Sequence, residues 1–382
     1  MRPSVMAVRG HGTLPLYIGG FLGPFGGGMV AVLVPELRDA FDATTAAVAA
    51  SIPAYLIPFA ALQLVSGTVG ERLGRRRVVF TGYVFYALFM VAGALAPGIG
   101  AFLVCRALQG TANAFLTPLL LAGLADEVPP RQIGRAVGTF AAVQTAAVAL
   151  SPLVGGLLGA IDWRLAFLVP AVVAVGLAFL PPRDGAPRDE IPRLRSVVTP
   201  RVGLLSAAAF AGYAGVTGVG FLVAVLAADE FGLGSVERGV LLAGFGVAGM
   251  LLGRTAGAAV DRFGRVPVVL VGTGVCAVLV ALLGIAPTAG WLAVLWFVTG
   301  LGSALVWAGI NTLAVEAVPG NRAGGTSVIG AFKFAGSAVA PLLWLPLYHA
   351  DPRLGFAGAG VMAAVSGVFV LPLSRHAARA KV

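Results

Sequence analysis

The chain has 382 residues, a hydrophobic fraction of 58% and a charged fraction of only 11%. A soluble globular domain carries roughly 25% charged residues, so this composition excludes a water-soluble protein. The net charge of +10 does not indicate a nucleic-acid-binding protein, because the basic residues lie between apolar segments instead of in one patch. The long apolar runs predict a polytopic helical membrane protein, since a bacterial barrel has short alternating segments.

Twelve apolar segments are long enough to cross a bilayer, which needs roughly 20 residues. In chain order they are expected at about 13–36, 46–70, 78–96, 99–122, 133–159, 163–181, 203–228, 237–260, 266–285, 289–315, 323–347 and 353–373. The polar stretch between the sixth and seventh segments predicts a linker. We therefore expect an N-terminal six-helix half (1–181), a cytoplasmic linker (182–202) and a C-terminal six-helix half (203–382).

The distribution of basic residues predicts the orientation in the membrane. With the N-terminus inside, 19 of the 26 Lys and Arg residues fall in inside segments, four in outside loops and three within spans. By the positive-inside rule, both termini are then cytoplasmic. The excess of arginine over lysine, together with abundant Ala, Gly and Val, suggests a GC-rich genome. We expect a multi-pass protein of the bacterial cytoplasmic membrane.

An internal repeat of about 190 residues relates the two halves. The stretch GTVGERLGRRR at 67–77 aligns with GAAVDRFGRVP at 257–267. The matched positions are Gly67 with Gly257, Glu71 with Asp261, Arg72 with Arg262, Gly74 with Gly264 and Arg75 with Arg265. The glycines allow a tight turn, and the acidic residue can pair with arginine. We expect this motif to form a gate, with the first copy as a latch between the halves on the inner side. Two six-span halves related by such a repeat are typical of transporters.

The motif resembles the loop 2–3 signature of the major facilitator superfamily, with Glu71 where the family usually has Asp. Two further stretches carry the resemblance: RALQG at 106–110 in the fourth span, and ALSPLVGG at 149–156 followed by DWRLAF. The second is similar to the signature of the twelve-span drug/proton antiporters. The resemblance implies an all-α membrane fold of twelve helices in two pseudo-symmetric halves, which works by alternating access.

The antiporter-like motif also has a physical explanation of its own. Pro152 frees a backbone carbonyl and bends the fifth span, while Gly155 and Gly156 allow a neighbouring helix to approach closely. Ser151 stands where the family normally has glycine. The eighth span offers a matching face of glycines at spacings of four, namely Gly249, Gly253 and Gly257. We expect these two faces to meet across the halves.

Polar side chains share one face of the fourth span and one face of the tenth span. Helical spacing places Arg106, Gln109 and Asn113 together on the fourth. The tenth span offers Trp296, Trp307 and Asn311. In the fold that the resemblance implies, both spans line the central cavity, so these six residues are candidates for substrate binding. A charged side chain in the bilayer is costly, which favours a cavity-facing Arg106.

Lys333 is the other cation placed deep in the membrane. It lies about ten residues from either end of the eleventh span, roughly 15 Å by helix rise, which is too far for easy snorkelling. None of the 16 carboxylates falls near the middle of a span. We therefore expect Lys333 to line the cavity, either as the group that exchanges the coupling proton or as a fixed charge that holds an anionic substrate.

These features predict a secondary active efflux transporter of amphipathic drugs or metabolites, preferably neutral or anionic ones, coupled to protons, with antibiotic resistance as its consequence. The alternative is an importer or facilitator of an organic anion or nutrient with the same fold. A membrane enzyme or receptor is a third hypothesis. An enzyme would need a cluster of His, Cys or carboxylate side chains at membrane depth, which the sequence lacks.

We expect no catalytic residues, no metal site and no cofactor. The only two cysteines, Cys105 and Cys276, lie in apolar runs without metal-ligand spacing. The stretch GFGVAG at 244–249 matches a dinucleotide-binding pattern, but no strand precedes it and it lies within a span. The expected partners are a small-molecule substrate, protons and the lipid bilayer, but not nucleic acid. We expect the chain to act as a monomer.

Overall fold

The computed structural model describes residues 12–129, 132–184, 198–318 and 322–379, and within these ranges the chain is helical, without a strand. Eleven helical segments are long and apolar enough to cross a membrane, and a shorter apolar helix, Leu165–Ala178, takes the sixth predicted position. Large apolar side chains such as Phe85 and Leu88 are half exposed, as expected for a surface that faces lipid. The predicted all-α membrane fold is confirmed.

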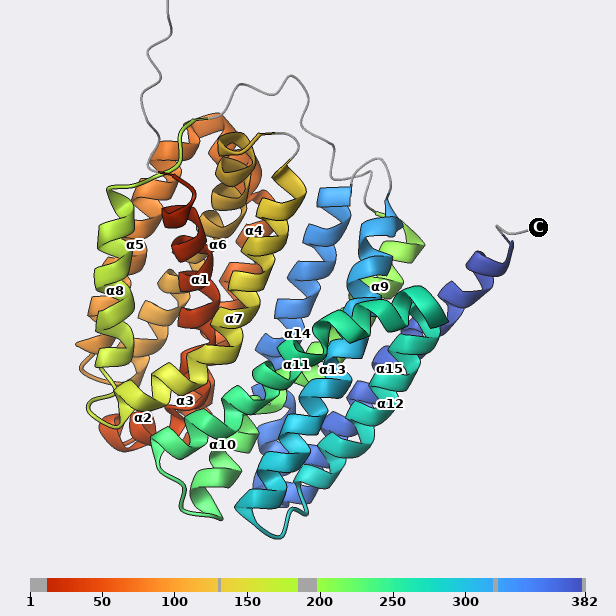
Figure 1. Ribbon diagram of the computed structural model, residues 1–382. Helices are drawn as coiled ribbons and strands as arrows, with labels where there is room; N and C mark the ends of the chain where they lie inside the picture. Colours follow the sequence, from red (N-terminus) through yellow and green to blue (C-terminus); the bar gives the residue numbers. More distant parts are fainter. Residues whose placement is uncertain (1–11, 130–131, 185–197, 319–321, 380–382) are drawn as a thin grey trace, which may run out of the picture.

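The N-terminal half occupies one side of the molecule (Figure 1). Its first span is broken by a short 3₁₀ turn and its second begins with a short helix. The elements are α1 (Leu14–Gly28), η1 (Met29–Ala31), α2 (Val34–Phe41), α3 (Thr45–Ala49), α4 (Ser51–Leu73), α5 (Arg75–Ala94), α6 (Ile99–Glu127), α7 (Ile133–Gly159) and α8 (Leu165–Ala178).

The C-terminal half repeats this order on the other side. Its first span is also broken by a 3₁₀ turn, and it begins at Pro200, slightly before the expected position 203. The elements are α9 (Pro200–Gly215), η4 (Thr217–Val219), α10 (Gly220–Asp229), α11 (Ser235–Phe263), α12 (Arg265–Leu283), α13 (Ala289–Ala317), α14 (Arg322–Ala350) and α15 (Pro352–Arg379).

The repeated motif forms the same turn in both halves. Gly74 between α4 and α5 has φ +88°, and Gly264 between α11 and α12 has φ +89°. With these φ and ψ values, glycine is the residue that fits without strain. The turn at Gly74 lies beside the start of the linker, since the Arg76 backbone N–H donates to Asp184 over 2.9 Å. We call this end of the bundle the linker face, and the opposite end the far face.

An ion pair that the repeat motif did not reveal fixes each turn. Arg75 donates to Asp126 at the end of α6 over 2.6 Å, and Arg265 donates to Glu316 at the end of α13. The arginines and the acids each recur 190 positions apart. Arg201 at the start of α9 also lies 3.9 Å from Glu316. These pairs tie helices within one half, whereas the sequence predicted Arg75 as part of a latch between halves.

The two halves meet mainly through α7 against α11 and α4 against α14. Near the far face, α7 and α11 are almost in backbone contact. A Cβ on Gly239 would lie 2.6 Å from the carbonyl oxygen of Pro152, and one on Gly156 would collide with the carbonyl of Ser235. The expected meeting of the fifth and eighth spans is confirmed, and Gly156 serves it as predicted.

The predicted glycine face on α11 is wrong. A Cβ added to Gly253 or Gly257 would have no atom of another residue within 4 Å, and one added to Gly249 would meet only the carbonyl of Gly300, 3.8 Å away in its own half. The contact uses Gly239 and Gly246 instead, the latter against Ala149. The reason is that α7 and α11 cross near the far face and then separate toward the linker face.

This geometry predicts different effects for two alanine substitutions on the same helix. Gly239→Ala should destabilise the protein by about 1–3 kcal/mol, because the added methyl group presses on the backbone of α7. Gly253→Ala should be neutral or stabilising by up to about 1 kcal/mol, because alanine favours the helix and the position is open. Thermal unfolding of the purified proteins in one detergent measures both; equal melting temperatures would contradict the crossing described above.

Candidate functional site

Ser151 and Pro152 are neighbours in the last third of α7, and the serine compensates for a hydrogen bond that the proline cannot make. Proline has no N–H to donate to the carbonyl of Val148, one turn earlier. The Ser151 hydroxyl donates to this carbonyl over 3.1 Å and is fully buried. Ser151 also lies directly against Gly28 at the end of α1. The departure from the family pattern therefore has a structural reason, since the hydroxyl satisfies the carbonyl that the proline frees.

Arg106 lies inside the N-terminal half with an exposed fraction of 0%. Its Nη1 donates to the Gly26 carbonyl on α1 over 3.1 Å and to Oε1 of Gln109 over 2.8 Å. The guanidinium lies 4.3 Å from the ring centroid of Tyr55. Its Nε and Nη2 have no hydrogen-bond acceptor among the described residues. Through these contacts Arg106 connects α1, α4 and α6.

The other predicted polar residues of α6 are also buried between helices. Gln109 donates to the Phe89 carbonyl on α5 over 2.8 Å. Asn113 donates to the Tyr55 hydroxyl over 2.9 Å, and this hydroxyl in turn donates to the carbonyl of Gly23 over 3.2 Å. Together with Arg106 they form one network that joins α1, α4, α5 and α6. The structure gives these residues packing contacts, and their contact with substrate stays a prediction.

The two predicted indoles of α13 have different surroundings. Trp296 is buried in the C-terminal half, where its Nε1 donates to the Leu242 carbonyl over 3.4 Å and its ring stacks on Phe245 at 4.6 Å. Trp307 is partly exposed and packs edge-on against Tyr213 of α9, with 4.4 Å between centroids. Asn311, one turn further toward the linker face, is exposed. Trp307 and Asn311 are therefore the accessible members of this set.

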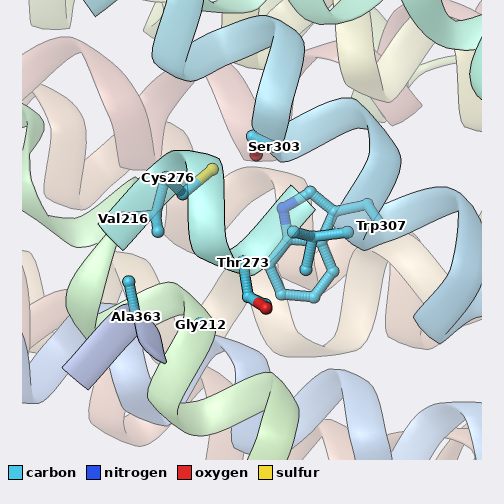
Figure 2. A pocket seen from close by; sticks show the side chains of 8 residues that line it. Gly212, Val216, Thr273, Cys276, Ser303, Trp307 and Ala363 are labelled. Carbon is cyan, nitrogen blue, oxygen red and sulfur yellow. The ribbon is translucent and has the colours of Figure 1, made fainter. Parts of the chain in front are cut away.

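Behind Trp307 lies a small cavity inside the C-terminal half, of about 10 Å³. Figure 2 shows Thr273, Cys276, Ser303 and Trp307 around it. This volume is about the minimum that holds one water molecule, whereas ligand pockets measure roughly 300–1,000 Å³. The cavity is too small for a substrate.

Lys333 is partly exposed on α14 and differs from Arg106 in its contacts. Its Nζ lies 4.8 Å from the ring centroid of Phe334 and 5.1 Å from that of Tyr213. No ion pair in the described part of the chain includes Lys333. The ammonium is therefore partly compensated by two aromatic rings, and no carboxylate of the described residues neutralises it.

The rings around Lys333 continue into the other half. Phe334 contacts Phe59 of α4 edge-on, with 5.0 Å between centroids and an interplanar angle of 83°. Phe59 stacks on Tyr55 at 6.2 Å, and Tyr55 carries Arg106. A continuous row of rings thus joins the two membrane cations across the interface between the halves. Neither Phe59 nor Phe334 was predicted, because a phenylalanine in an apolar span gives no signal that separates it from ordinary packing.

The charged contact between the halves lies on the far face. Arg238 at the start of α11 is 4% exposed and pairs with Glu36 of α2. It also donates to the carbonyl of Val32 over 3.3 Å and to that of Leu233 over 2.7 Å. An exposed pair, Arg38 with Asp229 at 3.4 Å, lies beside it. From the sequence, Arg38 and Arg238 were expected only as two of the four basic residues in outside loops.

On the linker face, the gate residues whose side chains the structure describes as exposed, Arg72, Asp261 and Arg262, make no such contact with other described residues. Asp261 and Arg262 are exposed at the end of α11, and no described hydrogen bond or ion pair joins them to the N-terminal half. Arg72 is also exposed. The side chain of Glu71 and the surroundings of Gly67 lie outside the described residues. The latch seen in this structure is therefore the one on the far face.

Comparisons with known proteins agree with this architecture. The family model described as Major Facilitator Superfamily matches residues 16–253 and 205–382. Among solved structures, a POT family transporter in complex with a thioalcohol-conjugated peptide is similar with a TM-score of 0.78 at 13% identity, over 95% of this chain and 96% of that one. The xylose transporter XylE from E. coli, partially occluded and inward open, is similar with a TM-score of 0.72 at 16% identity, over 94% and 96%. At these identities the similarity shows the fold alone.

Three curated relatives are closer in sequence. The tetracenomycin C resistance and export protein of Streptomyces glaucescens is 31% identical over 40% of this chain and 28% of its own length. The puromycin resistance protein pur8 of Streptomyces alboniger is 32% identical over 39% and 33%. A multidrug resistance protein B homolog of Mycobacterium tuberculosis is 31% identical over 38% and 28%. The matched part of the chain thus spans about a third or less of each relative.

The far-face contact predicts a change in accessibility when Arg238 is neutralised. Breaking hydrogen bonds to a charged group costs about 1.5–3 kcal/mol, so Arg238→Gln should separate the halves there at least about tenfold more often. We would measure maleimide labelling of Ser235→Cys, a buried position beside this contact, after replacing Cys105 and Cys276. Arg164→Gln, which removes an exposed arginine on the same face, is the control.

The double exchange Glu36→Arg with Arg238→Glu should restore slow labelling, because it keeps the pair with reversed charges. Slow labelling in Arg238→Gln itself would show that the pair does not hold the far face closed.

Proposed function

The chain belongs to the Major Facilitator Superfamily, and on this premise we propose that it is a secondary active efflux transporter. The proposed cargo is a neutral or anionic amphipathic compound, exported in exchange for protons by alternating access. The family consists of multi-pass membrane transporters, and the relatives named above are resistance and export proteins. The direction of transport, the cargo and the coupling ion are the parts that we propose.

The observation that carries the proposal is the environment of Lys333. It is an accessible ammonium at membrane depth, beside Phe334 at the interface with α4 and beside Tyr213, which in turn packs against Trp307. No described ion pair neutralises it, and no carboxylate is expected near the middle of a span. A positive charge beside flat apolar rings favours an amphipathic anion and disfavours a permanent cation. Arg106 adds to the positive potential from inside the N-terminal half.

The proposed orientation follows from the distribution of Lys and Arg residues along the sequence. The positive-inside rule places the linker face in the cytoplasm. The far face, closed by Arg238 and Glu36, is then the outer face, and α7 and α11 separate toward the cytoplasm. We propose that this conformation loads substrate from the inside. Opening of the far-face contact would release the substrate outside, as alternating access requires.

Substitutions at Lys333 test the proposal and its coupling. Lys333→Ala should lose most of the binding of anionic substrates. Lys333→Arg keeps the charge but cannot exchange a proton near neutral pH. If Lys333 carries the coupling proton, Lys333→Arg should bind substrate but lose transport driven by a pH gradient. If Lys333 only holds the anion, Lys333→Arg should keep much of the coupled transport.

The measurement is substrate-stimulated proton flux in proteoliposomes, with anionic, neutral and cationic compounds and with Arg254→Ala, an exposed arginine of α11, as the control. Transport by both Lys333 variants at the wild-type rate would remove the support for the proposal. So would saturable export of a quaternary ammonium compound that does not depend on Trp296 or Trp307. Accumulation of the substrate inside vesicles in place of its export would favour an importer.

The repeat motif supports a second gate on the linker face. We propose that Glu71 and Arg72, with Gly67, Gly74 and Arg75, close this face when the far face opens. Asp261 and Arg262 of the second copy are exposed and accessible to a partner. Glu71→Gln should leave expression intact and change the transport rate, because it weakens a charged hydrogen bond that exists in one conformation. Equal transport rates for Glu71→Gln and the wild type would refute this gate.

A further inference from the structure

We propose that Phe59 and Phe334 form an aromatic subsite beside Lys333, and that this subsite selects planar aromatic anions as substrates. The inference rests on the proposed function and names its substrate class. The two rings come from different halves, since Phe59 is on α4 and Phe334 on α14. They meet edge-on with 5.0 Å between centroids.

The position of Phe59 is fixed by the polar network of its own half. Phe59 is 5% exposed and stacks on Tyr55, one helical turn earlier, with an interplanar angle of 18°. Tyr55 is held in turn by its hydrogen bonds with Gly23 and Asn113 and by Arg106 over its ring. A ring whose neighbour is held by three contacts is preorganised, which lowers the entropy cost of binding a ligand against it.

Phe334 lies beside the ammonium that would bind the charged group of the same ligand. Lys333 Nζ lies 4.8 Å from its ring centroid, and a ring face compensates an ammonium only partly. A carboxylate would compensate the ammonium better than a ring face does, because two opposite full charges attract each other more strongly than a charge and a ring. An anion that binds at Lys333 would therefore replace its contacts with the rings of Phe334 and Tyr213.

A planar aromatic acid satisfies both features at once. Its acid group would meet Lys333, and its ring would pack edge-on or stacked against the touching pair of Phe59 and Phe334, the geometry that aromatic pairs prefer. A saturated acid of the same shape would gain the charge but not the ring contacts. Because Phe59 moves with one half and Phe334 with the other, the subsite is complete only while the halves meet at this point. Both halves would then hold the substrate.

Three compounds separate charge from aromaticity: naphthalene-2-carboxylate, decalin-2-carboxylate and 2-naphthalenemethanol. We would measure their binding to the purified transporter in detergent by equilibrium dialysis. The wild type should bind the naphthoate about fivefold to tenfold more tightly than the decalin acid, from one or two aromatic contacts. Phe59→Leu and Phe334→Leu should each lose this preference while binding of the decalin acid is unchanged.

The controls are chosen so that folding and general hydrophobicity do not produce the same result. Phe332→Leu changes an exposed ring directly beside Lys333, and Phe85→Leu an exposed ring on α5; both should bind like the wild type. Phe59→Tyr keeps the ring and should retain the preference. Melting temperatures of all variants show whether they are folded.

The outcomes distinguish this inference from the proposed function. If Lys333→Ala loses both acids but Phe59→Leu behaves like Phe332→Leu, the aromatic subsite is refuted and the anion site stands. A wild type that prefers the decalin acid, or does not discriminate, also refutes the subsite. If Lys333→Ala keeps both acids, the proposed function itself loses its support.

Discussion

The close crossing of α7 and α11 near the far face is the constraint on which the rest of this structure depends. Gly239 and Gly156 bring the two backbones together there, and Arg238 bonded to Glu36 and Val32 closes the same end. From this crossing α7 and α11 separate toward the linker face, while α4 and α14 form the other main contact between the halves. Gly253 and Gly257, further along α11, accordingly have no neighbour across the interface. Which side chains can receive a substrate follows from this arrangement.

Arg106 and Lys333 are both cations at membrane depth, but their surroundings differ. The guanidinium of Arg106 contacts a carbonyl, an amide and an aromatic ring, and the side chain is fully buried. Such contacts reduce the cost of a buried charge and hold α1, α4 and α6 together. Lys333 has only ring faces and remains accessible. Its charge is the less satisfied one, which is the property that a site for an anion requires.

The two halves repeat the same turn and the same kind of ion pair at the linker face. The positive-φ glycines at 74 and 264 and the arginine–carboxylate pairs Arg75–Asp126 and Arg265–Glu316 build the same corner twice. Each pair joins two helices of one half at the linker face. The far-face pair Arg238–Glu36, by contrast, joins one half to the other. The first kind of contact holds each half together, and the second kind holds the two halves in the arrangement that this structure shows.

The sequence predicted the features that depend on local pattern. Apolar run length predicted the spans, because a bilayer sets the length of a helix that crosses it. The offset of 190 predicted the doubled architecture and the turns at Gly74 and Gly264. The sequence also identified Lys333, since a lone lysine deep in a span is expensive wherever the helix packs.

Features that depend on which helix faces meet could not be predicted in this way. The glycines at 249, 253 and 257 have the right spacing but lie beyond the crossing point. Gly239 and Gly246 make the contact without forming that spacing. Phe59 looks like any core phenylalanine until α4 is placed against α14. Arg238 and Glu36 are 202 positions apart, and they pair because the crossing brings the start of α11 close to the start of α2. Long-range packing, which no local pattern encodes, assigns these residues their partners.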